Sequence, residues 1–141
     1  MKIGLLLAPL ALLLATQAQA APPAKAVLLD FSSEALIDSA SAKAVLGEGI
    51  PKKVWSVYPV SKWGFVSQVQ GGMTSNGTCV VTARVMMVPL TQAVKAVLFR
   101  PQETSTTFDA LTGANLEQCK VLAKTKLAEA TQSVVSSLVK N

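Results

Sequence analysis

The two cysteines of this chain, Cys79 and Cys119, fall in segments whose apolar residues repeat with different periods. Cys79 opens an alternating run over residues 79–88, and such alternation is typical of a half-buried strand. Cys119 lies on an apolar stripe that recurs at helical spacing. The stripe consists of Leu116, Cys119, Ala123, Leu127, Ala130, Val134 and Leu138. A bond between the two cysteines would therefore hold the last helix against the apolar face of a central strand.

The rest of the composition favours a disulfide over other uses of the two thiols. A metal site would need histidine or further cysteines nearby, and the chain contains no histidine. A redox-active pair is usually spaced as Cys-x-x-Cys, whereas these two stand far apart in the sequence. We therefore expect a structural disulfide between Cys79 and Cys119, and we expect neither a metal nor a cofactor.

The first twenty residues have the three parts of a secretory signal peptide. Lys2 precedes an apolar run over residues 3–15, and Ala18-Gln19-Ala20 supplies the small residues that signal peptidase accepts. The run is shorter than the roughly 20 residues that a membrane-spanning helix needs. We expect cleavage after Ala20 and export to the periplasm or the extracellular space, where oxidising conditions favour the disulfide. No transmembrane segment is expected in the mature chain.

The remaining pattern predicts one α+β domain over residues 32–141, after an N-terminal lead over residues 21–31. A hydroxyl N-cap at Ser32 and Ser33 predicts a first helix that ends near Gly47. Asn115 with Gln118 resembles a capping box at the start of the long last helix. Strands are expected at 54–58, 63–70, 79–88, 93–100 and 105–108. We expect two layers, an antiparallel sheet of about four to five strands with both helices on one face.

Asn76-Gly77 predicts a two-residue type I′ turn between the strands at 63–70 and 79–88. Simple pairing from that turn would place the polar side of one strand on the apolar side of the other. A slip of one residue exchanges the faces and removes this conflict. Gly71-Gly72 is the expected site of the extra residue, because glycine adopts the backbone of a bulge without strain.

Residues with catalytic potential are few and scattered. Without histidine the chain lacks the usual general base, and adjacent Ser61 and Lys62 would point to opposite faces of a strand. We therefore expect no enzymatic activity. The alternative is a small-ligand carrier or an enzyme whose carboxylates, such as Glu103 and Asp109, or Ser/Lys groups come together only in the fold.

The chain has a formal net charge of +5, and removal of Lys2 with the signal peptide would leave a modest basic excess. Lys52, Lys53 and Lys62 flank the first predicted strands, and Arg84 lies on the less apolar side of a central one. We interpret these four residues as a weakly basic sheet surface. The expected partner is another envelope or secreted protein, or an anionic polymer, which the chain would bind as an inhibitor, adaptor or envelope accessory. Arginines interleaved with aromatic residues are missing, so no nucleic acid is expected.

Export with cleavage after Ala20 has a direct test. The chain expressed in a bacterial host should be recovered outside the cytoplasm with Ala21 as its first residue, by intact-mass measurement. An uncleaved chain held in the membrane fraction would contradict the signal-peptide assignment.

Overall fold

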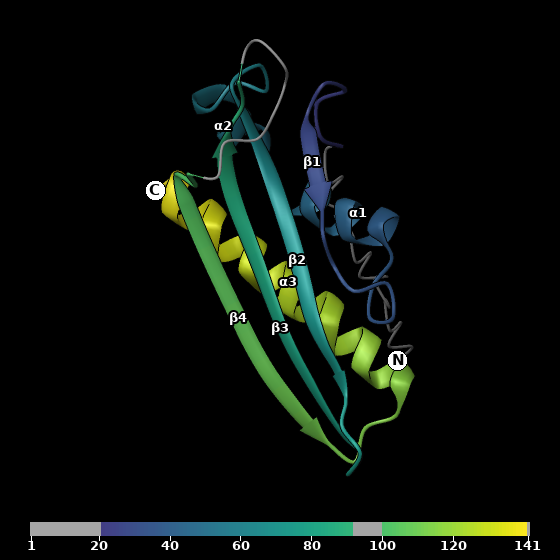
Figure 1. Ribbon diagram of the computed structural model, residues 1–141. Helices are drawn as coiled ribbons and strands as arrows, with labels where there is room; N and C mark the ends of the chain where they lie inside the picture. The colour runs from purple at the N-terminus through teal and green to yellow at the C-terminus, as the bar shows by residue number, and fades with distance from the viewer. Residues whose placement is uncertain (1–20, 92–99, 141) are drawn as a thin grey trace, which may run out of the picture.

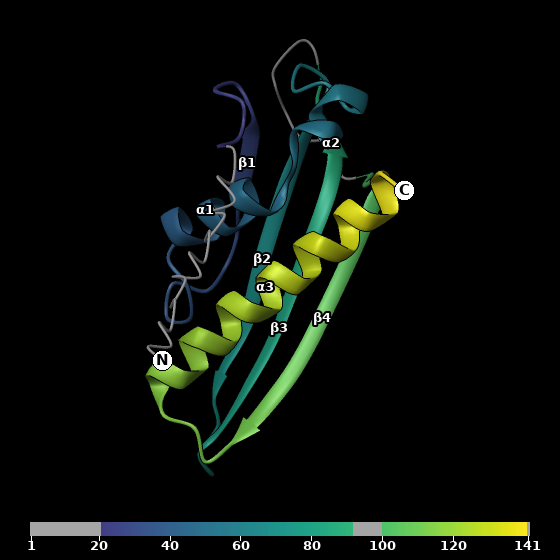
Figure 2. The ribbon, with the colours of Figure 1, turned by 180° about the vertical axis from the view of Figure 1, so that it is seen from behind.

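The computed structural model describes residues 21–91 and 100–140, which form a sheet with helices on one side (Figure 1). The elements are β1 (Val27–Asp30), α1 (Ser39–Gly49), α2 (Lys52–Val57), β2 (Trp63–Met73), β3 (Thr78–Pro89), β4 (Glu103–Thr112) and α3 (Leu116–Leu138). Figure 1 looks onto the sheet with α1 and α3 behind it, and Figure 2 shows both helices in front. The predicted two-layer α+β class, with both helices on one face, is confirmed.

The sheet has the order β1-β2-β3-β4 and is mixed rather than wholly antiparallel. β2, β3 and β4 form an antiparallel meander, in which Phe65 pairs with Met87 and Ala83 with Thr107. β1 pairs with β2 in parallel, with Leu28 beside Phe65. The sequence prediction treated residues 21–31 as a lead, so it missed this strand. β1 is short and needs β2 beside it, which a local pattern does not reveal.

Helix α3 and strand β3 form the centre of the core. The predicted capping box is present: the Gln118 amide donates to Asn115 Oδ1, and the Asn115 amide donates to Gln118 Oε1, both at 2.9 Å. The predicted stripe faces the sheet, and its central members Cys119, Ala123, Leu127, Ala130 and Val134 are fully buried. Alanines in this stripe let the helix approach the sheet closely. Cys119 is bonded to Cys79 of β3, as the sequence predicts.

The first helix begins later than predicted, at Ser39 rather than near Ser32. Asp38 is its N-cap and accepts from the Ser41 amide at 2.8 Å. Ser32 is unavailable as a cap because it joins the sheet: its hydroxyl donates to Asp30 Oδ1 at 2.6 Å and accepts from the Val69 amide at 2.9 Å. The long-range bond to β2 therefore outweighs the local capping signal.

Residues 54–58, predicted as a strand, lie mostly in the short helix α2. Pro51 precedes the helix, and its fixed φ suits an N-terminal position. Val54 and Trp55 are both buried, and the Trp55 ring packs edge-on against Phe65 with the centroids 5.4 Å apart. Adjacent side chains in a strand would point to opposite faces, so burying both favours the helix over the β-branched preference.

The β2–β3 hairpin confirms which strand faces lie together, but the predicted type I′ turn at Asn76-Gly77 and the predicted bulge at Gly71-Gly72 are both wrong. Pairing runs without interruption from Trp63 opposite Pro89 to Met73 opposite Cys79. The extra residue lies in the turn itself, where the Gly77 amide donates to the Thr74 carbonyl at 3.1 Å and Gly77 has φ +75°. A three-residue turn with a left-handed glycine thus replaces the two-residue type I′ turn.

Two predicted strands remain. The segment at 105–108 belongs to β4, which is longer than predicted. The strand predicted at 93–100 lies almost wholly outside the described residues.

Removing the disulfide should weaken the fold without changing its topology. Replacing Cys79 and Cys119 by alanine should lower the free energy of unfolding by about 2–4 kcal/mol, because the unfolded chain loses a cross-link. Urea unfolding of the double variant measures this loss, with thiol titration of the denatured wild type as the check on pairing. Two free thiols in the unreduced wild type, or an unchanged midpoint, would contradict the disulfide.

Gly71 and Gly72 form a matched pair for testing the sheet. Both have positive φ, +128° and +149°, but a Cβ on Gly71 would overlap the Val80 carbonyl oxygen, whereas one on Gly72 meets nothing within 4 Å. Gly72→Ala should cost about 1–3 kcal/mol of unfolding free energy through backbone strain alone. Gly71→Ala should cost clearly more in the same urea titration. Equal costs for the two variants would contradict the close β2–β3 approach at Gly71.

Candidate functional site

The face of the sheet turned away from the helices carries both polar and apolar side chains. Because strand side chains alternate, the register places Gln68, Thr82, Arg84, Thr106 and Phe108 on this face. Arg84 stands between Gln68 and Thr106, and its Nε donates to Thr106 Oγ1 at 3.4 Å. No described helix covers this face, which Figure 1 presents to the viewer. The face offers hydrogen-bonding groups, with one cation among them.

Five lysines gather at the end of the molecule where β1 and β2 begin. Lys52 and Lys53 occupy the first turn of α2, and Lys62 directly precedes β2. Lys53 lines a groove with Lys140, which follows α3, and Lys62 lines a pocket with Lys25, which precedes β1. Figure 1 shows α2 and the C-terminal end of α3 at this same end of the sheet. We call these residues, Lys25, Lys52, Lys53, Lys62 and Lys140, the basic end.

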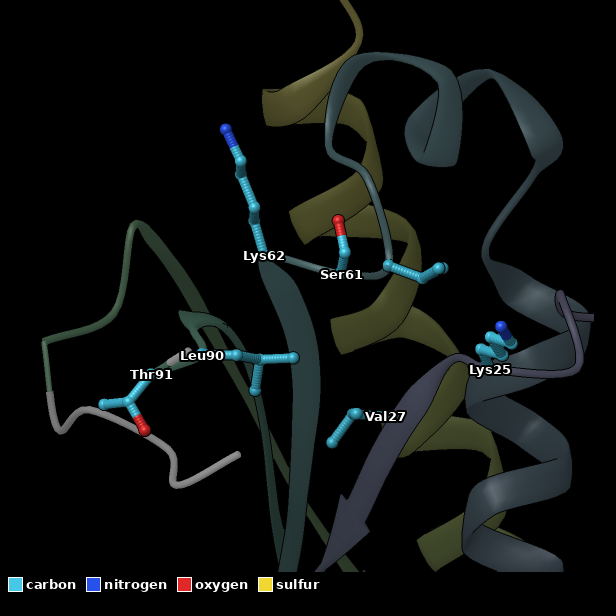
Figure 3. Close-up of a pocket in the computed structure, with 7 residues that line it drawn as sticks. Lys25, Val27, Ser61, Lys62, Leu90 and Thr91 are labelled. Atoms are coloured by element: carbon cyan, nitrogen blue, oxygen red, sulfur yellow. The ribbon is translucent and has the colours of Figure 1, made fainter. Parts of the chain in front are cut away.

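A pocket of about 580 Å³ lies within the basic end (Figure 3). Val27, Val60 and Leu90 supply its apolar walls, and its polar lining consists of Lys25, Ser61, Lys62 and Thr91. Gly64 lets Val27 and Leu90 lie close to the β2 backbone, since a Cβ at this position would lie 3.0–3.3 Å from their atoms. The pocket therefore combines three apolar side chains with two amines and two hydroxyls.

The four residues predicted as one basic surface do not all lie together. Lys52, Lys53 and Lys62 share the basic end. Arg84 pairs with Gln68, about 20 Å along β2 from Lys62 at the usual rise per residue. The predicted surface is thus divided into a lysine group and a separate arginine. Sequence reasoning missed Lys25 and Lys140, because each is far from the others along the chain and no local signal joins them.

The groups named for a catalytic alternative are not gathered either. In Figure 3 the Lys62 side chain extends away from the Ser61 hydroxyl rather than toward it. Glu103 begins β4, and Asp109 lies six residues further along the strand, also about 20 Å away. The Glu103 carboxylate accepts from the Thr104 amide at 3.3 Å, and Asp109 pairs with Lys126 at 3.2 Å. Neither a nucleophile with its base nor a carboxylate pair results from this arrangement.

The charged cluster around Lys126 connects β4 to α3. Hydrogen bonds from the Ala110 amide and from Lys126 hold the pKa of Asp109 below its ordinary value, and bonds to Glu129 and Asp109 raise the pKa of Lys126. The Thr107 hydroxyl also donates to the Lys126 carbonyl at 2.7 Å. Because the lowered pKa belongs to the folded state, the Asp109 contribution is present at neutral pH and is lost as pH falls through that pKa.

Asp38 is likewise structural. Hydrogen bonds from the Ser41 side chain and amide lower its pKa, as expected for a carboxylate that caps a helix. Across residues 21–91 and 100–140 there is no cluster of three or more histidine, cysteine or acidic side chains placed to hold a metal. In the same ranges no helix has the length and hydropathy needed to cross a membrane.

Comparison with known proteins gives only remote likenesses. No family model matches the chain, and no curated protein matches it significantly. The PelC dodecamer from Paraburkholderia phytofirmans aligns with a TM-score of 0.43 at 14% identity, covering 82% of this chain and 93% of that one. A minor lipoprotein from Acinetobacter baumannii aligns with a TM-score of 0.39 at 12% identity, covering 78% and 89%. Likenesses this remote carry no conclusion about function.

Proposed function

We propose that this chain is an exported, non-catalytic accessory protein that binds an anionic component of the cell envelope through its basic end. The observation that carries the proposal is the gathering of five lysines from four separate segments at one end of the fold. The leader-like first twenty residues and the Cys79–Cys119 bond support export. The scattered placement of the serine, lysine and carboxylate candidates supports a role without catalysis.

Among the described residues, four lysines of the basic end lack the salt bridges that two lysines of α3 form. Lys25, Lys52, Lys62 and Lys140 form no salt bridge with any described residue, whereas Lys120 pairs with Glu117, and Lys126 with Asp109 and Glu129. Glu103 also lies at the basic end, at the start of β4, so the end is not purely cationic. Positive charges still outnumber it, and Lys25, Lys52, Lys62 and Lys140 are exposed to solvent.

The chemistry of these cations favours an extended anionic surface over a small specific ligand. A lysine amine is a strongly hydrated point charge on a flexible stem, and it lacks the fixed fork with which arginine recognises a single phosphate or carboxylate. Several such charges spread over one end attract a surface of many anions, and salt screens the attraction over about 8–10 Å. A phospholipid headgroup layer presents such a surface.

A second candidate function rests on the pocket in Figure 3. Its apolar walls and the amines of Lys25 and Lys62 fit one molecule with an apolar body and an anionic group. A carrier of this kind would bind its ligand in a 1:1 ratio, and an apolar contribution would make that binding less sensitive to salt.

The test uses the mature chain with phosphatidylglycerol-rich and phosphatidylcholine vesicles. We expect binding to the anionic vesicles only, weakening as salt rises. Replacing Lys52 and Lys62 by glutamine should reduce the affinity at low salt about 30-fold, since each lysine near an anionic surface contributes about 1 kcal/mol.

The matched control replaces Lys43 and Lys124 by glutamine. Both side chains are exposed and lie outside the basic end, so the same net charge is lost elsewhere. Equal losses for the two double variants would show that net charge alone drives binding. That result would overturn the proposal, as would an affinity for the anionic vesicles that does not change with salt concentration.

A further inference from the structure

Strand β4 forms one edge of the sheet and has no partner on its outer side among the described strands. An edge strand presents unpaired backbone groups, and proteins usually protect it with lysine, proline, a bulge or a short length. β4 spans ten residues and contains neither lysine, arginine nor proline. β1, at the opposite edge, has only four residues. The β4 edge is therefore the more open of the two to another strand.

The hydrogen bonds of β4 identify which backbone groups face outward. The Thr104 amide donates to Glu103 Oε1 at 3.3 Å, and the Ala110 amide donates to Asp109 Oδ1 at 2.8 Å, so neither points to β3. In an antiparallel strand alternate residues direct both backbone groups to the same side. Thr106 and Phe108, between those two positions, thus direct their amides and carbonyls to the free edge. Two carboxylates thus occupy the outward amides of Thr104 and Ala110, whereas the backbone groups of Thr106 and Phe108 between them form no such hydrogen bond with a described side chain.

Apolar side chains lie on both sides of this edge. Phe108 is 69% exposed on the open face of the sheet. On the helix side, Leu111, 41% exposed, and Val121, 65% exposed, line a groove of about 440 Å³ between the end of β4 and the first turns of α3. A strand added along the edge would alternate its side chains between these two apolar surfaces.

We propose that β4 pairs antiparallel with β4 of a second copy of this chain, about a two-fold axis at Phe108, to form one continuous eight-stranded sheet. The inference is independent of the proposed function. A two-fold axis normal to the sheet makes the same edge serve both copies and leaves the helices of both on one face.

The positions of the charged residues favour a two-fold axis at Phe108 over an axis at a nearby residue of β4. An axis at Thr106 would set Glu103 directly opposite Asp109 of the second copy, and like charges so placed are destabilising. An axis at Thr107 would set Glu103 opposite Leu111. The axis at Phe108 instead places the two Phe108 rings opposite each other, and Asp109 opposite Thr107. Aromatic cross-strand pairs of this kind are stabilising.

Pairing would also satisfy the edge amides that the carboxylates now occupy. The amides of Thr104 and Ala110 would exchange their side-chain acceptors for carbonyls of the second strand. Asp109 would keep its salt bridge to Lys126, which does not depend on the edge. In the single chain the amides of Thr104 and Ala110 therefore bond to carboxylates, and in the dimer they would bond to carbonyls of the second chain.

The test measures the mass of the mature protein by sedimentation equilibrium over a wide range of concentration. We expect a dimer at high concentration, with the Thr106 and Phe108 amides protected from hydrogen exchange only there. Thr106→Lys should weaken dimerisation at least about tenfold, because it places a charge at the centre of the paired edge. Thr106→Pro should do the same by removing an outward amide that β3 does not use.

Gln70→Lys is the matched control. It adds the same charge to the same open face, but on the interior strand β2, where Gln70 is exposed and pairs with Thr82. This variant should dimerise as the wild type does. A chain that stays monomeric throughout would overturn the proposal, as would a dimer that Thr106→Lys does not weaken. Protection of the β4 amides only on addition of a different protein would assign the edge to that protein instead.

Discussion

The packing of α3 across β3, closed by the Cys79–Cys119 bond, is the contact on which the rest of the structure depends. It joins segments forty residues apart and buries both apolar stripes at once. β2 and β4 both pair with β3, which is the strand that α3 covers. Helices close one face of the sheet, and no described helix covers the other face. β1 and β4 are the edge strands among the described ones.

The two proposals use different parts of the protein surface. The basic end combines cations that precede β1 and β2 with those of α2 and with Lys140, just beyond the end of α3. The β4 edge lies along the opposite side of the sheet from β1 and carries acids but no base. Attraction to an anionic surface and pairing with a second copy thus rest on separate chemistry, long-range charge in one case and directional hydrogen bonds in the other.

Local patterns account for the parts of the fold that were predicted well. The stripe of α3, its capping box and the alternation of β3 are each set by neighbours within a few residues, so sequence periodicity reveals them. The errors lie where a distant contact outweighed a local preference. Ser32 bonds to β2 instead of capping a helix, and residues 52–57 adopt a helix that buries Trp55 against Phe65.

By itself, the sequence determined the fold class, the long last helix, the two central strands and the pairing of Cys79 with Cys119. Those features follow from hydrophobic period and from the presence of only two thiols. Tertiary structure alone decided that β1 joins the sheet in parallel, that Arg84 stands apart from the lysines, and that Lys25 and Lys140 join Lys62 and Lys53. Such placements depend on how strands and helices cross in space, because side chains distant in sequence meet only after the core has closed.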